Sequence, residues 1–289
     1  MTAIVQSKAA APRLATPWRD RRAALTLALP ALIVLVFLYV APLARLLSLS
    51  LHSEAGFSLE AYGRILGDSY GRSLVWNSLR LGLITTGVTL AVGYPAAFGL
   101  AFSKGALRSL FLASLFLPLA ASVIAKAFAW TILLRSHGAV NDALLALHLT
   151  QKPIRMIFTQ TSLIVGSTNI FLPFMILPIY AVVAQIDPRL TEAAATLGAP
   201  PPQAFLRVVV PLSLPGVVAG VALVFSLSVS AYVVPTLLMG ENYQTLANAI
   251  AKAFLLVRDP ALGSAAGAIL MAIGLAVVVG GNRLGGVGR

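Results

Sequence analysis

The residue types that enzymes and metal centres use are scarce in this sequence and share no useful spacing. It contains no cysteine, which excludes disulfides, thiol catalysis and cysteine-ligated metals. Its three histidines, His52, His137 and His148, lie far apart and lack the spacing of metal ligands. No phosphate-binding glycine loop, His-Glu-x-x-His motif or Gly-x-Ser-x-Gly motif occurs. We therefore expect neither an enzyme nor a chain that holds a metal or cofactor.

The polar stretch 185–211 carries the clearest local signature. Asp187 followed by Pro188 is typical of a helix start, because the aspartate accepts a backbone N–H and proline fits the first helical position. Gly198 suits the left-handed residue that ends a helix, and a second short segment is expected over 203–210. One face of the first helix is formed by Leu190, Ala194 and Leu197. Two amphipathic segments in one loop predict a docking surface.

The composition defines the class of protein. Of the 289 residues, 58% are hydrophobic and only 10% are charged, whereas soluble domains carry about 25% charged residues. The mean hydropathy is +0.90. The net charge of +12 is dispersed in loops between apolar runs, and nucleic-acid binding needs that charge gathered on one face or segment. These values predict an integral membrane protein that does not bind nucleic acid.

Six apolar segments approach or exceed the length of about 20 residues that a membrane-spanning helix needs. They are 23–47, 74–102, 109–134, 159–184, 212–238 and 261–281. We therefore predict an all-α integral membrane protein with a six-helix transmembrane domain over 23–282 and tails over 1–22 and 283–289. The polar loop 185–211 then lies between the fourth and fifth helices.

Charge sets the predicted orientation and energy source. Basic residues divide almost evenly between the two sides, but five in the N-terminal tail favour a cytoplasmic N-terminus, since the first helix usually dominates. Both tails and the loop 185–211 are then cytoplasmic. None of the nine Asp and Glu residues falls in the middle of a span. Ion-coupled carriers usually bury carboxylates there, so the energy is expected to come from elsewhere.

Prolines and paired glycines occur inside several predicted spans. Gly216 with Gly220, and Gly263 with Gly267, have a spacing that lets helix backbones approach closely. The prolines are interpreted as ordinary kinks rather than breaks. They are Pro95, Pro118, Pro173, Pro178 and Pro235.

Lys126 is the one charged residue well inside a predicted span. An intramembrane cation either faces a cavity or extends to the membrane interface, and the sequence leaves both readings open. Our hypothesis is that Lys126 and Trp130, one helical turn apart, border a solute pathway together with Asn169 and Tyr232.

The polar loop resembles the signature of inner-membrane permease subunits of binding-protein-dependent ABC importers. That signature is Glu-Ala-Ala, three residues, Gly, nine residues and Ile-x-Leu-Pro. The matching residues are Glu192, Ala193, Ala194, Gly198, Val208, Val210 and Pro211, with valine in place of both isoleucine and leucine. The resemblance extends from about residue 25 to about 282. Within the family the chain is most similar to spermidine/putrescine-type permeases, in the stretches 93–96, 138–141, 153–159 and 211–216.

The resemblance implies a multi-pass protein of the bacterial inner membrane that works in a complex. Its partners would be a second homologous permease, two copies of a cytoplasmic ABC ATPase that bind the ATP, and a periplasmic substrate-binding protein. The loop helix would dock on the ATPase. The residues that the resemblance assigns to this coupling are Glu192, Ala193, Ala194, Leu197, Gly198, Val208 and Pro211.

Other function classes and substrates stay open at this stage. A secondary carrier or channel not powered by ATP is the main alternative, and a membrane-embedded enzyme is another, although no catalytic constellation is visible. The expected solute is a polyamine, an opine or a related nitrogenous compound, with small anionic solutes as rivals. Relatives that import phosphonates or iron share much of the sequence pattern.

Overall fold

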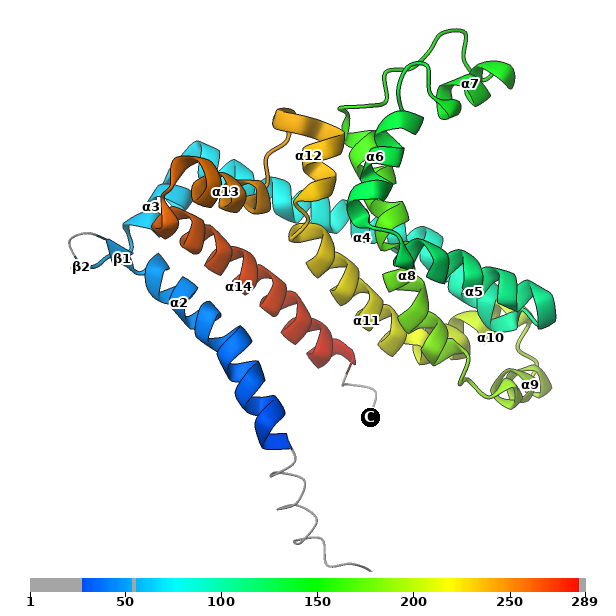
Figure 1. The fold of residues 1–289 in the computed structure, drawn as a ribbon. Helices are drawn as coiled ribbons and strands as arrows, with labels where there is room; N and C mark the ends of the chain where they lie inside the picture. The colour runs from blue at the N-terminus through cyan, green and yellow to red at the C-terminus, as the bar shows by residue number, and fades with distance from the viewer. Residues whose placement is uncertain (1–27, 54–55, 286–289) are drawn as a thin grey trace, which may run out of the picture. The chain divides into compact units, whose positions relative to one another are not determined.

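The computed structural model describes residues 28–53 and 56–285, and these are mostly helical (Figure 1). The predicted tail 1–22 and the last four residues of the predicted tail 283–289 lie outside the described residues. The main elements, in chain order, are α2 (Ala41–Ser50), β1 (His52–Ser53), β2 (Gly56–Phe57), α3 (Glu60–Gly67), α4 (Ser69–Phe102), α5 (Gly105–Ala120), α6 (Val123–Leu133), α7 (Ala139–Ala146), α8 (Gln160–Val183), α9 (Pro188–Thr196), α10 (Pro201–Ala204), α11 (Val210–Val229), α12 (Val233–Met239), α13 (Leu246–Lys252) and α14 (Pro260–Gly285). Short π-helical or 3-10 turns occupy Val36–Val40, Phe205–Val209, Gly240–Asn242 and Ala253–Val257.

The helices long and apolar enough to cross a membrane confirm the predicted class of protein. Within the described residues there are five: Ala28–Ser50, Ser69–Phe102, Gln160–Val183, Pro201–Val229 and Pro260–Gly281. A bent pair, α5 and α6, makes a sixth when it is counted as one span. The all-α membrane fold is therefore confirmed, and six crossings with cytoplasmic termini stay a prediction.

Most of the first of these helices belongs to a compact unit of its own. Residues 28–48 belong to a separate compact unit, and the rest of the chain from Leu49 forms the other. The helix Ala28–Ser50 has 23 residues with a mean hydropathy of 2.3 and contains the π-helical turn Val36–Val40. Its length is sufficient for one crossing.

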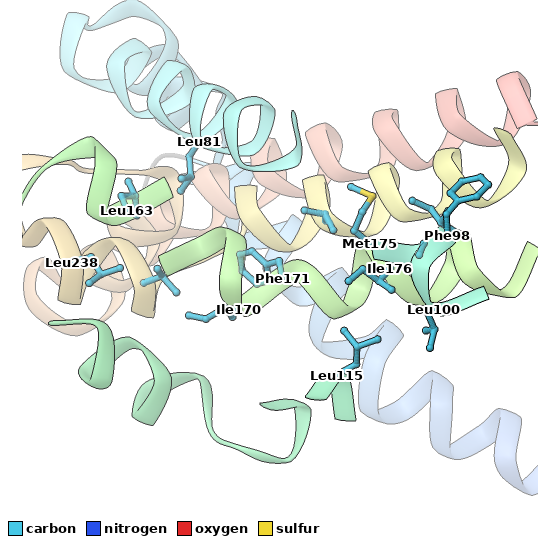
Figure 2. Packing of buried hydrophobic residues seen from close by; sticks show 14 of the residues in the cluster. Leu81, Phe98, Leu100, Leu115, Leu163, Ile170, Phe171, Met175, Ile176 and Leu238 are labelled. Carbon is cyan, nitrogen blue, oxygen red and sulfur yellow. The ribbon is translucent and has the colours of Figure 1, made fainter. Parts of the chain in front are cut away.

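The centre of the second unit consists of α4, α8 and α11, whose backbones approach one another at glycines. A Cβ atom on Gly220 of α11 would lie 2.8 Å from the Met175 sulfur of α8, and one on Gly216 would lie 2.8 Å from the Pro178 carbonyl oxygen. The small-residue spacing therefore serves helix packing inside this chain, as predicted. Figure 2 shows buried side chains of this core, including Phe98, Met175 and Ile176.

A second cluster of buried side chains joins the start of α4 to α3, α13 and α14. Its members are Ala61, Ile65, Leu74, Leu246, Ala265 and Ala266. The Ser78 hydroxyl of α4 accepts a hydrogen bond from the Leu246 backbone N–H at 2.9 Å. This cluster fixes α13 and the first turns of α14 against α4, while the rest of α14 runs beside α11 (Figure 1).

The predicted third span, 109–134, is wrong as a continuous helix. The structure has two helices here, α5 and α6, bent by 102° at a short break (Figure 1). Pro118 lies in the last turn of α5, Ala121 is extended, and Ser122 has a non-helical ψ of 138°. Proline removes one helical hydrogen bond and crowds the preceding turn, and the Ser122 hydroxyl then caps α6 by accepting from the Ile124 N–H at 3.2 Å.

The predicted fifth span, 212–238, also differs from the structure at both ends. Its helix begins earlier, because residues 201–229 form one continuous helix rather than a separate segment over 203–210. It ends at Val229, and α12 begins anew at Val233. In a continuous helix Pro235 would clash with the Ala231 carbonyl, so the chain leaves the helix just before that position.

Candidate functional site

The loop helix α9 has the boundaries and caps that the sequence predicts. The Asp187 carboxylate accepts a hydrogen bond from the Arg189 N–H at 2.9 Å, and Pro188 is the first helical residue. Gly198 has φ +83°, and the Ala199 N–H donates to the Ala194 carbonyl at 3.0 Å. The end of α9 is thus a left-handed glycine terminus that satisfies the last carbonyls of the helix.

The side chains of α9 face outward. This helix, all of which the structure describes, has no buried residue. Leu190 is 45% exposed and Leu197, at the end of the helix, is 88% exposed. Glu192 and Ala193 are exposed as well, and Ala194 is half-buried. An apolar face that stays accessible on a well-capped helix is suited to a protein partner.

The segment after α9 is attached to the end of α4 through aromatic rings. The Phe205 ring meets the Phe98 ring edge to face at 5.3 Å between centroids, and Phe98 contacts Tyr94 at 4.8 Å. The Tyr94 hydroxyl shares a hydrogen bond of 3.0 Å with the Ser213 hydroxyl of α11. Sequence reasoning missed this connection, although Tyr94, Phe98 and Phe102 recur at four-residue spacing on α4.

We name the contacting rings of Tyr94, Phe98 and Phe205 the aromatic anchor, and a cavity of about 270 Å³ lies between it and α9. It is lined by Phe102, Thr191, Ala195, Ala199, Pro201, Ala204, Phe205 and Val209. Of the predicted coupling residues downstream, Val208 is half-buried and Pro211 lies exposed in the first turn of α11. The loop therefore consists of the exposed helix α9, a cavity beside it, and a following helical segment that contacts α4 and continues into α11.

Two of the four predicted pathway residues come together. The Trp130 indole N–H of α6 donates to the Asn169 Oδ1 of α8 at 3.2 Å. Lys126 lies one turn earlier on α6, but its ammonium donates to the Pro118 carbonyl at 3.0 Å. Tyr232 lies in the break between α11 and α12 and is 43% exposed. The structure thus pairs Trp130 with Asn169 and directs Lys126 toward the helix break.

At the opposite end of α4 from the aromatic anchor, polar contacts hold the α12–α13 connection. The Tyr243 hydroxyl donates to the Asn77 carbonyl at 2.7 Å, and the Asn77 amide donates to the Gln244 carbonyl at 3.0 Å. Burial raises the pKa of the Tyr243 phenol, and the positive charge of Arg80 acts in the opposite direction. This phenol stays protonated at neutral pH and remains a hydrogen-bond donor.

Ion pairs add to the same end of the unit. Arg64 of α3 contacts Glu60 at 3.3 Å and Asp259 at 3.2 Å, and Lys252 pairs with Glu241. Within residues 28–53 and 56–285, no group of three His, Asp or Glu side chains is placed to hold a metal ion. The charges there connect loops to helices.

The fold and the loop define a class: a multi-pass helical membrane protein with a capped, outward-facing helix between two spans. Comparison with known proteins then gives the family. Residues 93–284 match the family described as "Binding-protein-dependent transport system inner membrane component". The chain belongs to this family and is a multi-pass protein of the inner membrane.

Individual relatives are consistent with this assignment. The chain is 36% identical over 209 residues to the spermidine/putrescine transport system permease protein PotB of Salmonella typhimurium, covering 72% of each chain. It is 32% identical over 260 residues to PotB of Haemophilus influenzae, covering 86% of this chain and 91% of the relative. Among solved structures, a bacterial ABC transporter that imports alginate matches with a TM-score of 0.72 at 20% identity, covering 93% of this chain and 97% of that chain.

Proposed function

We propose that this chain is one of two permease subunits of an ATP-driven importer and moves a small solute by alternating access. The observation that carries the proposal is α9: a capped helix with exposed Leu197 and small Ala193, at the position of the family signature. In the proposed orientation both termini and α9 are cytoplasmic. Two copies of an ABC ATPase bind the ATP, and a periplasmic binding protein delivers the solute.

The proposed coupling begins where α9 meets the ATPase. Because Ala193 and Ala194 are small, the helix can approach a partner surface closely, and Leu197 supplies an apolar contact. Motion of α9 reaches α8 directly through the four residues that join the two helices, and it reaches the other spans by two further connections. One is the continuous helix over Pro201–Val229, and the other is the contact of Phe205 with Phe98 on α4. A short helix such as α9, joined to the spans at a few places, can transmit such a movement as a rigid body.

The proposed solute path runs beside Trp130 and Asn169, with Tyr232 at the nearby helix break. The indole of Trp130 offers an aromatic face to an organic cation, and the Asn169 amide, whose oxygen accepts the Trp130 N–H, also has N–H groups that can donate. The proposed solute is a polyamine, supported by the transport named for the PotB relatives. This chain has no carboxylate in the middle of a span, so the second permease would supply the countercharge.

The test is reconstitution of the complete transporter with its binding protein and ATPase in vesicles. We expect spermidine uptake that requires ATP on the side of the vesicle membrane that carries the ATPase. This uptake should persist when ion gradients are collapsed. Uptake that follows a proton or sodium gradient without ATP would instead favour a secondary carrier. ATP-driven uptake of an opine but not of spermidine would retain the importer and replace the substrate.

A further inference from the structure

The break between α5 and α6 leaves backbone groups that need partners. The last carbonyl groups of a helix have no intrahelical donor, and in an apolar environment each unpaired group is costly. Only the Ala121 N–H returns to the end of α5, donating to the Pro118 carbonyl at 3.2 Å. A single backbone hydrogen bond therefore joins the 102° bend to the end of α5, and the Pro118 carbonyl that accepts it has a second lone pair for a further interaction across the break.

Lys126 supplies that interaction from the other side of the break. Its ammonium donates to the Pro118 carbonyl at 3.0 Å, eight residues back in the chain. Lys126 is half-buried, and it is absent from the ion pairs found in residues 28–53 and 56–285. A cation in the first turn of α6 is disfavoured by the dipole of that helix, but the same charge is favoured at the C-terminal end of α5.

The direction of α6 decides where Trp130 lies. On α6, Ala127 is fully buried, and Trp130 follows one turn after Lys126 with its indole on Asn169. A Cβ atom on Gly166 of α8 would lie 3.9 Å from the Trp130 ring, so the ring already sits against the α8 backbone. A change in the angle of α6 would lift this ring from α8.

We propose that Lys126 is a positioning residue: its bond to the Pro118 carbonyl clasps the α5–α6 break and thereby holds Trp130 against Asn169. We name this contact the Lys126–Pro118 clasp. The inference rests on the proposed function for its effect on transport. It assigns Lys126 no contact with the solute.

The test uses Trp130 as its own probe. Trp18→Phe and Trp76→Phe leave Trp130 as the only tryptophan of the permease, whose emission and acrylamide quenching are measured in the purified permease without solute. Lys126→Met is compared with Lys126→Arg, which keeps the charge and donor. Lys104→Met is the matched control, because this exposed lysine precedes α5 and is far along the chain from the break.

We expect Lys126→Met to shift Trp130 emission and raise its quenching, with Lys126→Arg and Lys104→Met close to the parent protein. In the complete transporter, Lys126→Met should lower the maximal spermidine uptake rate about tenfold, the factor given by losing about 1.4 kcal/mol from a charged hydrogen bond. The solute concentration at half-maximal rate should stay unchanged. Lys126→Arg should recover most of the rate.

Two results would overturn the clasp. One is unchanged Trp130 emission and an unchanged maximal rate in Lys126→Met. The other is unchanged emission with a raised half-maximal solute concentration, which would make Lys126 a solute contact. If the parent transporter lacks ATP-driven uptake, the proposed function fails, and the fluorescence comparison in the isolated permease still decides the clasp.

Discussion

The helices α8 and α9 are separated by only four residues of chain, yet their side chains meet opposite environments. α8 is packed between α4 and α11, with Met175 and Ile179 fully buried. α9 has no buried residue along its described length, and its form depends on Asp187 at one end and Gly198 at the other. One helix is therefore stabilised by packing against the rest of this chain, whereas the other is stabilised by its own caps and keeps an accessible surface.

The largest expected effect comes from disturbing the packed helix. Gly220→Val places new atoms 2.8 Å from the Met175 sulfur and 3.2 Å from its carbonyl oxygen, where the α8 backbone cannot yield easily. We expect the free energy of unfolding to fall by about 1–3 kcal/mol, with a matching loss of folded protein. Thermal unfolding in detergent measures this. Gly99→Ala is the control, since its Cβ meets no atom within 4 Å; equal melting of both variants would contradict the packing argument.

The next effect should separate function from folding in α9. Gly198→Val meets no atom within 4 Å, but its φ of +83° costs a branched side chain about 1–2 kcal/mol or more. We expect the permease still to insert, because α9 has no buried residue and its strain stays local, while solute-stimulated ATP hydrolysis and uptake are abolished. Ala194→Trp should act alike by holding the helix away from its partner.

Gly198→Asn is the matched variant for this prediction, because asparagine tolerates the left-handed conformation. It should retain most of the coupled ATP hydrolysis. Normal transport by both Gly198→Val and Ala194→Trp, at normal expression, would show that α9 is not the coupling element.

A smaller effect is expected where the exposed and packed regions join. Phe205→Ala removes the edge contact with Phe98, which contributes about 0.5–1.5 kcal/mol beyond area burial. We expect fewer solute molecules transported per ATP hydrolysed, by a factor of about 2–10. Leu206→Ala, at a neighbouring position that is 64% exposed, is the control. An equal number of solute molecules transported per ATP in the two variants would show that this contact does not take part in coupling.

The smallest effect is expected at Glu192. Its carboxylate is exposed, and an exposed ion pair with a partner contributes about 1 kcal/mol or less. Glu192→Ala should therefore weaken ATPase binding by less than about fivefold, measured by titrating the ATPase onto permease in vesicles. The difference in ATPase affinity between Glu192→Ala and the parent permease should decrease at high salt, because exposed charges are screened. A complete loss of binding would mean that Glu192 is buried in the interface.

Local signals in the sequence were sufficient for the ends of α9 and for α8. Asp187, Pro188 and Gly198 act on the backbone within a few residues of themselves, and Thr159 caps α8 together with Ser162, three residues further along the chain. The break after α5 was not predictable in the same way. Pro118 alone is equally compatible with a kink, and the outcome depends on where the Lys126 side chain finds an acceptor.

Contacts between distant parts of the chain were the other limit. Phe98 and Phe205 are far apart in sequence, and nothing in their spacing reports that they meet. Trp130 and Asn169 were expected to border a cavity together, and they are joined by a hydrogen bond. Lys126 and Tyr232 were expected beside them, but their positions depend on the helix breaks after α5 and after α11, which the apolar segments in the sequence do not indicate. Periodicity describes one helix at a time.

α4 is one continuous helix over Ser69–Phe102 and is long enough to cross a membrane. Asn77, which bonds Tyr243, and Phe98, which contacts Phe205, lie about 32 Å apart along one helix, close to the roughly 30 Å of bilayer hydrocarbon. A tilt of about 4° in a rod of that length moves its far end by about 2 Å. A displacement applied at the Phe205 contact would therefore reach the α12–α13 connection along a single helix, in which Pro95 removes one backbone hydrogen bond close to Phe98, and its amplitude there would be set by leverage.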